Sequence, residues 1–208
     1  MKFTINRNTL LNTLNSVSKG LSSKTPMPSL TGIYVEAEDN KLIFTTTNRE
    51  LSIQVVVPAN ENLEIEETGN CLIPGKYFVE IIKKIEDETI TVAIFDETAI
   101  KIITERSQFT LNALEKEVFP KLTFVGEGEP ILFSAQNLKT IIKQTSFSAS
   151  TSEQRLVLTG VNFEINKDEL FITATDSFRL SRKNTKFKYI CQKKLLLNSS
   201  LIFIFYFV

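Results

Sequence analysis

One segment of the chain occurs twice, and this repetition constrains the fold more than any other feature of the sequence. Residues 30–48 and 158–176 are identical at 7 of 19 positions, all at an offset of 128 residues. An amphipathic helix and a polar loop precede each copy, which makes chance similarity between two β-rich segments a poor explanation. We therefore expect the chain to contain two copies of one α+β unit.

The first unit is predicted to hold a strand–helix–three-strand pattern twice. Its strands alternate apolar and polar residues, and its helices repeat apolar residues at helical spacing. Short turns between the strands favour antiparallel sheets. The predicted elements are strand 1–5, helix 7–19 and strands 30–37, 41–47 and 50–58, then strand 70–73, helix 75–85 and strands 89–95, 99–105 and 108–113.

The pattern begins a third time near residue 131. We expect domain boundaries of 1–125 for a complete first domain and 126–208 for an incomplete second one, with an aberrant tail from about residue 187. The last eight residues, 201–208, are all apolar, and no second amphipathic helix precedes them. A truncated or frameshifted product is the prediction, and an authentic short form is the alternative. The predicted elements are strand 131–135, helix 136–147 and strands 156–165, 170–175 and 178–183.

Composition argues against most enzymes. The chain has no histidine, which removes the commonest general base and the usual serine, cysteine and zinc sites. It has no phosphate-binding glycine loop, and no paired carboxylates fall on one predicted face. We expect no catalytic residues, no metal and no cofactor; carboxylate-based catalysis is the remaining enzymatic alternative.

The two cysteines and the chain ends predict a cytoplasmic protein. Cys71 and Cys191 lie far apart in the sequence, so neither a disulfide framework nor a metal cluster is expected. Both are interpreted as small buried residues in a reducing compartment. The N-terminus lacks a signal-peptide core, and a run of eight apolar residues is too short to span a bilayer.

Charge is sorted onto the predicted helices, although the chain as a whole has 24 basic and 24 acidic residues. The three helical segments carry seven basic residues and one acidic residue, Glu80. Each helix buries one face against its sheet, so these charges should point away from the sheet. Such a surface suits duplex DNA held by its phosphates, without base recognition. The basic residues are Arg7, Lys19, Lys76, Lys83, Lys84, Lys139 and Lys143.

Several motifs together resemble the bacterial sliding clamp family, the beta subunit of DNA polymerase III. The central ones are Thr173–Leu180, which fits the family's A-T-D-x-x-R-L segment, and Arg155–Gly160 ahead of it. The resemblance covers residues 1 to about 185. Further matching stretches are Met1–Thr4, Pro26–Leu30, Ile73–Lys76, Phe109–Leu114 and Phe119–Pro120.

The resemblance implies a DNA clamp fold: repeated βαβββ units, antiparallel sheets outside and helices lining one face. The family forms a homodimeric ring of three-domain subunits, which encircles duplex DNA and tethers the replicative polymerase. It thus implies that Lys24 and the loop 152–156, with Arg155, also face DNA. It further implies that the third domain is absent here, so we expect this chain not to close a ring.

The resemblance also implies partner sites. The polymerase and the clamp loader would bind through short peptide motifs in a pocket with an apolar floor from Leu158 and Leu180, of which only half is expected here. The edge of the dimer would be the strand with Phe109 and Leu111. The alternative function is a stand-alone peptide-interaction module of the clamp fold that does not encircle DNA. The pocket residues are Leu158, Thr175, Ser177, Phe178, Arg179 and Leu180.

Overall fold

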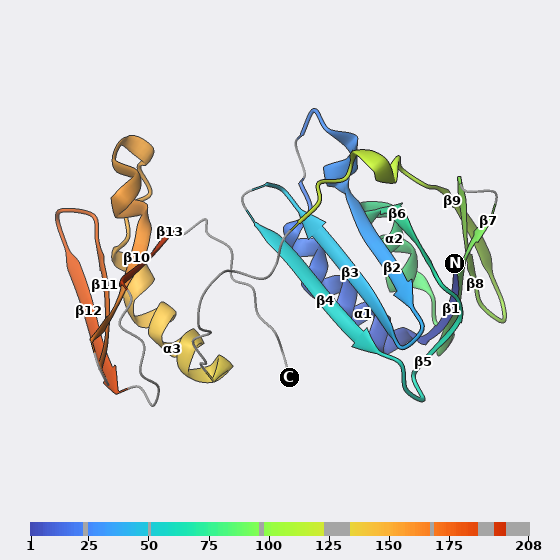
Figure 1. Ribbon diagram of the computed structural model, residues 1–208, viewed down its shortest axis with the longest axis horizontal. Coiled ribbons are helices and arrows are strands. Elements are labelled where there is room, and N and C mark those ends of the chain that lie inside the picture. Colours follow the sequence, from blue (N-terminus) through green and yellow to red (C-terminus); the bar gives the residue numbers. More distant parts are fainter. Residues whose placement is uncertain are drawn as a thin grey trace. The chain divides into compact units, whose positions relative to one another are not determined.

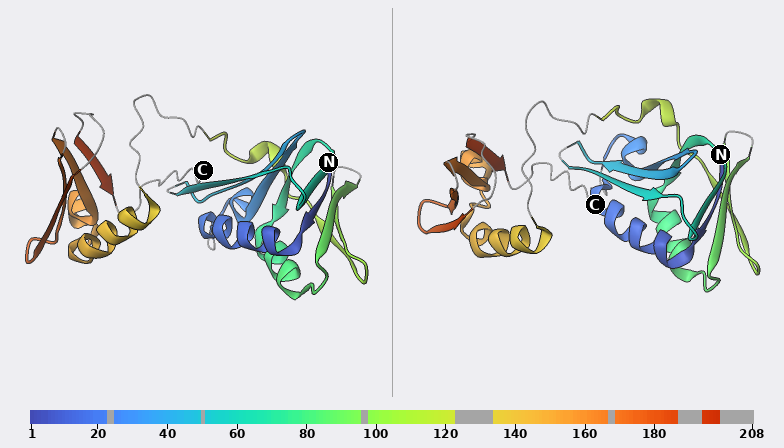
Figure 2. Two further views of the ribbon diagram at one scale, coloured as in Figure 1. Left: turned by 90° about the horizontal axis from the view of Figure 1, so that it is seen from below. Right: turned by 60° about the horizontal axis from the view of Figure 1, so that its bottom comes forward.

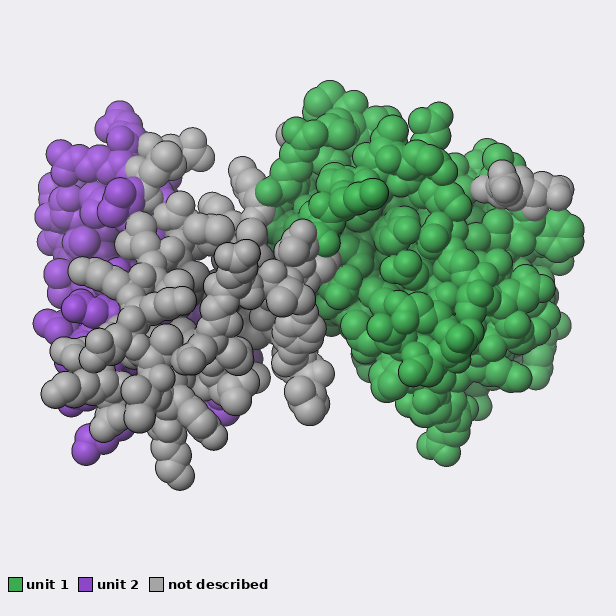
Figure 3. Space-filling model, viewed as in Figure 1, with its two compact units in different colours: residues 1–124, 202–208 green, residues 125–201 purple. Residues whose placement is uncertain are grey.

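The chain folds as two compact units, residues 1–124 and residues 125–201 (Figure 3). The structure is a computed structural model. It describes residues 1–22, 25–49, 51–95, 98–122, 134–166, 169–186 and 194–198.

The first unit combines helices and antiparallel strands in the predicted order (Figure 1). Among its described residues, two strands match the predicted bounds, β3 (Lys41–Thr47) and β7 (Thr89–Phe95). The other elements are β1 (Lys2–Asn6), α1 (Arg7–Val17), β2 (Gly32–Glu38), β4 (Ser52–Pro58), β5 (Leu63–Glu67), β6 (Gly69–Pro74), α2 (Gly75–Lys84), β8 (Ala99–Ile103) and β9 (Gln108–Asn112).

The two halves of the first unit exchange strands. The strand orders are β5-β1-β7-β8-β9 and β4-β3-β2-β6, and every pairing is antiparallel. The first strand of the first half, β1, therefore lies between β5, which connects the two halves in the sequence, and β7 of the second half. Conversely, β6 precedes α2 in the sequence but pairs with β2 of the first half. The halves are thereby tied into one domain.

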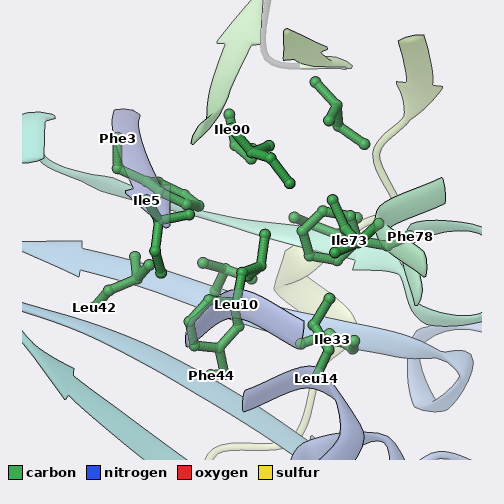
Figure 4. Packing of buried hydrophobic residues seen from close by; sticks show 14 of the residues in the cluster. Phe3, Ile5, Leu10, Leu14, Ile33, Leu42, Phe44, Ile73, Phe78 and Ile90 are labelled. Carbon is green, nitrogen blue, oxygen red and sulfur yellow. The ribbon is translucent and has the colours of Figure 1, made fainter. Parts of the chain in front are cut away.

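A single hydrophobic core joins both sheets and both helices of this unit. Side chains from β1, α1, β3, β6 and α2 point toward one another, among them Phe3, Leu10, Phe44, Ile73 and Phe78 (Figure 4). The helices α1 and α2 contact each other and lie on the same side of the sheets (Figure 2). The predicted apolar helix faces are confirmed.

Three predictions for the first unit were wrong in detail. Residues Pro28–Thr31 form a 3-10 helix, so the strand expected from Leu30 begins at Gly32. Helix α1 ends at Val17, and a 3-10 helix continues over Ser18–Gly20. Strand β5 was missed, although its apolar residues alternate with glutamates, because that alternation spans only five residues.

The second unit repeats one helix and one sheet. Helix α3 (Ala135–Thr145) packs on the sheet through Leu138, Ile141 and Thr145, as predicted. The strand order is β12-β11-β10-β13, again antiparallel. The strands are β10 (Gly160–Asn166), β11 (Glu169–Thr175), β12 (Leu180–Lys186) and β13 (Lys194–Asn198).

The second unit corrects two predicted strand starts and adds one strand. The segment Glu153–Thr159, expected to enter a strand at Leu156, is a kinked 3-10 helix. The strand expected from Phe178 begins at Leu180, because residues 176–179 form the turn. Strand β13 was not predicted. Most of the predicted strand 131–135 and the segments 187–193 and 199–208 lie outside the described residues.

The internal repeat is confirmed by the turn that follows β3 and β11. Arg49 and Ser177 stand 128 residues apart and share a left-handed backbone, with φ of 76° and 77°. The amide of each donates to a threonine hydroxyl two residues earlier, Thr47 or Thr175, at 3.1 Å. The two hairpins therefore have the same geometry, as the sequence identities at this offset indicated.

Candidate nucleic-acid interface and peptide pocket

Arg7 connects the start of α1 with the end of α2. Asn6 caps α1 by accepting hydrogen bonds from the amides of Asn8 and Thr9. The Arg7 guanidinium then donates from Nη2 to the backbone carbonyl of Lys83 at 3.2 Å. A cation at the carboxyl end of a helix is favoured by the helix dipole. Arg7 therefore also has a structural role, because it joins the two helices. Its prediction as a DNA-facing residue did not include this role.

Exposed lysines lie at both ends of the α1–α2 pair. Lys83 and Lys84 are exposed in the last turn of α2, beside Arg7. At the other end, a Cβ on Gly75 would lie 2.6 Å from the Leu21 side chain, so the start of α2 lies close to the segment after α1. Lys76 and Lys19 are exposed there. The structure thus brings five of the predicted DNA-facing residues onto one helix pair.

Helix α3 presents a basic face in the second unit. Ser134 caps its first turn by accepting from the Asn137 amide at 3.2 Å. Lys139 and Lys143 are exposed, and no acidic residue occurs in the helix. Arg155 is also exposed, in the kinked 3-10 helix. Lys24 and the side chain of Leu156 lie outside the described residues.

The helix lysines form no ion pair with another described residue. Within the described part of the chain, the ion pairs involve other residues, such as Lys2 with Glu66 and Arg106 with Asp87. The exposed face of α1 is polar and uncharged. The arrangement offers positive charge without groups placed to read base edges, which suits phosphate contacts.

The predicted peptide pocket is centred on a tightly bonded hairpin. Asp176 Oδ1 accepts from the amides of Phe178 and Arg179 at 3.0 and 2.9 Å. Its Oδ2 accepts from Arg179 Nε at 2.9 Å. The backbone amides of Arg179 and Phe178 hold the pKa of the Asp176 carboxyl below its usual value. The Thr175 hydroxyl also donates to the Arg179 carbonyl, at 2.7 Å, so the turn is bonded across its whole length.

The hairpin exposes apolar side chains. Phe178 is 97% exposed at its tip and Leu180 is 65% exposed at the start of β12. Leu158 and Thr175 are half-buried, and Ser177 and Arg179 are exposed. The structure brings Thr175 to Leu180 together in one turn. Sequence reasoning missed Val157, which is 65% exposed although it lies in an apolar run.

The predicted dimer edge is a sheet edge. Strand β9 pairs with β8 and is the last strand in its sheet among the described residues. Phe109 and Leu111 are half-buried and pack against the core of the same unit. The edge therefore offers backbone hydrogen-bonding groups, with only part of these side chains available to a partner.

The described ranges contain one cysteine, Cys71, and no histidine. Among these residues, no group of histidine, cysteine, aspartate and glutamate side chains could hold a metal ion. Burial raises the pKa of the Cys71 thiol to about 12, so this cysteine is a poor nucleophile. None of the described helices has the length and apolar character needed to cross a membrane.

The chain is similar to known proteins over both units. The family described as "DNA polymerase III beta subunit, N-terminal domain" matches residues 1–123, and its central domain matches residues 133–196. The beta sliding clamp of Staphylococcus epidermidis is 41% identical over 185 residues, covering 87% of this chain and 49% of that protein. The Staphylococcus aureus clamp is 36% identical over 198 residues, covering 93% and 52%.

The structural comparison agrees with the sequence comparison. The crystal structure of the DNA polymerase sliding clamp from Bacillus subtilis has a TM-score of 0.91 and 33% sequence identity, covering 96% of this chain and 54% of that one. The predicted α+β clamp fold is thus confirmed. The chain spans about half the length of the curated relatives it matches. It belongs to the family of the bacterial sliding clamp, the beta subunit of DNA polymerase III.

Proposed function

We propose that this chain acts in bacterial DNA replication as a clamp component that holds duplex DNA by its phosphates and tethers the replicative polymerase. Membership of the clamp family supports this role. The observation that carries it is the set of exposed helix lysines in both units, without ion pairs to other described residues. The proposed role needs no catalytic residue and no cofactor.

Salt dependence of DNA binding tests the first part of this proposal. Affinity for a duplex of mixed sequence should fall steeply between 50 and 200 mM salt, with a log–log slope of about −0.9 for each phosphate contact. Fluorescence anisotropy with a labelled duplex measures it, and a second duplex of unrelated sequence should bind equally. A stand-alone peptide-interaction module would bind neither duplex, so absence of binding would favour that alternative.

We further propose that the polymerase and the clamp loader bind the hairpin through short peptides with apolar anchors. Leu180 is exposed beside Phe178, and each apolar anchor that becomes buried contributes roughly 1.5–3 kcal/mol before the costs of association. The hydrogen bonds to Asp176 fix the backbone of the turn from which Phe178 projects and which Leu180 follows.

Leu180→Asp should weaken binding of such a peptide by about tenfold or more, because it places a carboxylate against an apolar anchor. A labelled peptide carrying the clamp-binding motif of a bacterial replicative polymerase, titrated into the chain, measures the change. Val56→Asp is the matched control, since Val56 is also exposed, on β4 of the first unit. Equal affinities of Leu180→Asp and the wild type would exclude this pocket.

A further inference from the structure

The segment that follows β9 lies across the β4-β3-β2-β6 sheet of the first unit. It lies on the outer face of this sheet, which is the face opposite to the helices (Figure 2). This covering segment, Lys116–Leu122, begins with a 3-10 helix and crosses β2 and β3 (Figure 1). The Ser29 hydroxyl donates to the Val118 carbonyl at 3.4 Å, and the rings of Tyr34 and Phe119 stack at 5.2 Å and 10°. The β4-β3-β2-β6 sheet therefore already binds an extended segment of its own chain on its outer face.

The covering segment meets one row of side chains across three strands. Tyr34, Thr45 and Gln54 are register neighbours on β2, β3 and β4. Together with Phe119, Pro120 and Lys121 they line a cavity of about 260 Å³. Under the same segment Ser29 is only 2% exposed.

The second unit repeats this row at the offset of 128 residues. Asn162, Thr173 and Arg182 are register neighbours on β10, β11 and β12, in the positions of Tyr34, Thr45 and Gln54. Val157 takes the position of Ser29. The shared hairpin geometry at Arg49 and Ser177 shows that this offset holds in three dimensions. We call Val157, Asn162, Thr173 and Arg182 the outer row.

The outer row differs from its counterpart in exposure and charge. Val157 is 65% exposed, where Ser29 is buried. Arg182 is exposed with its guanidinium 4.6 Å from the centre of the Phe171 ring, where the first unit has the neutral Gln54. The ion pairs seen among the described residues do not include Arg182. The second unit therefore carries, at these positions, a cation without an ion-pair partner among the described residues and a separate exposed apolar residue.

We propose that the outer row binds, from a partner protein, an extended peptide with the chemistry of the covering segment and an added carboxylate. An apolar residue would lie on Val157, followed by an aromatic–proline pair over Asn162 and Thr173. The carboxylate would meet Arg182, which stands at the position of Gln54; in the first unit Gln54 and Lys121 line the same cavity. This inference goes beyond the proposed function, because it rests on the internal repeat and not on the Leu158–Leu180 pocket.

A peptide of residues 114–122, labelled with fluorescein and titrated into the complete chain, tests the proposal. Asn162→Tyr recreates the stacking partner that Tyr34 provides for Phe119, so it should tighten binding roughly threefold to tenfold. The Lys121→Glu peptide should bind the wild type roughly threefold more tightly than the parent peptide. That advantage should vanish in Arg182→Gln, which restores the glutamine of the first unit.

The peptide variants keep the test independent of protein folding. A Phe119→Ala peptide should lose the gain that Asn162→Tyr gives, and Leu180→Asp should leave the ranking of these peptides unchanged. Equal affinity of the Phe119→Ala and parent peptides, or no change with Asn162→Tyr, would overturn the proposal. A second copy of the chain is the other possible occupant of the outer row, and light scattering at the assay concentration detects it. If Asn162→Tyr raises the molar mass but not the affinity for the peptide, a second copy binds the outer row and the proposal fails.

Discussion

Phe3→Ala should lower the free energy of unfolding of the first unit by about 3–5 kcal/mol, the range for deleting a fully buried phenylalanine side chain. Residues so near a chain terminus are usually frayed and tolerant of change. Phe3, however, is 0% exposed, because β1 lies between β5 and β7 in the middle of a sheet. The expected loss is a large part of the roughly 5–15 kcal/mol that stabilises a domain.

Urea denaturation followed by circular dichroism measures this loss. Val56→Ala is the control: Val56 is 45% exposed on the edge strand β4, and the change should be within about 0.5 kcal/mol. A loss below about 1 kcal/mol for Phe3→Ala would mean that β1 is not held in the sheet.

Replacing the exposed lysines of α2 and α3 by glutamine should remove most of the affinity for duplex DNA. Each lysine that contacts a phosphate contributes about one unit to the log–log dependence of affinity on salt. The slope should therefore fall by about four to five units when all are replaced. The five positions are Lys76, Lys83, Lys84, Lys139 and Lys143.

A control with the same change in net charge separates local contacts from overall charge. Five lysines outside these helices, replaced by glutamine, should leave the slope within about one unit of the wild type. They are Lys41, Lys101, Lys121, Lys183 and Lys186. Equal loss in the two variants would show that DNA is held by net charge and not by the helix faces.

Much of the candidate site was predictable from the sequence, because its signals are local. Helical spacing identified the buried faces of α1, α2 and α3, and the basic residues left over are exposed, as with Lys83 and Lys139. The matched segments at offset 128 predicted two copies of one unit, and the turns at Arg49 and Ser177 have the same backbone geometry. For Arg7 the sequence predicted a DNA-facing charge but not the hydrogen bond to the Lys83 carbonyl. That bond joins residues 76 positions apart, so no local pattern indicates it.

One error in the second unit arose where an apolar run was interpreted as a strand. Leu158 and its neighbours have strand-like composition, yet Glu153–Thr159 is a 3-10 helix capped by Ser152. The equivalent segment before β2 is also a 3-10 helix, so the repeat was predicted correctly while the type of structure was not. Short apolar segments carry too little periodicity to separate the two states.

The sequence by itself determined the two repeated α+β units, the helix faces and the sorting of positive charge onto helices. These properties depend on spacing within about ten residues or on direct comparison of two segments. Only the tertiary structure decided which strands pair. Strand β1 pairs with β5 and β7, and β6 pairs with β2. The backbone N–H and C=O groups are the same on every strand, so they do not select a partner. The partner is selected by the packing of side chains in the common core. That exchange makes the two halves of the first unit one domain, in which α1 and α2 contact each other. Exposed lysines lie at both ends of this helix pair, Lys83 and Lys84 at one end and Lys19 and Lys76 at the other.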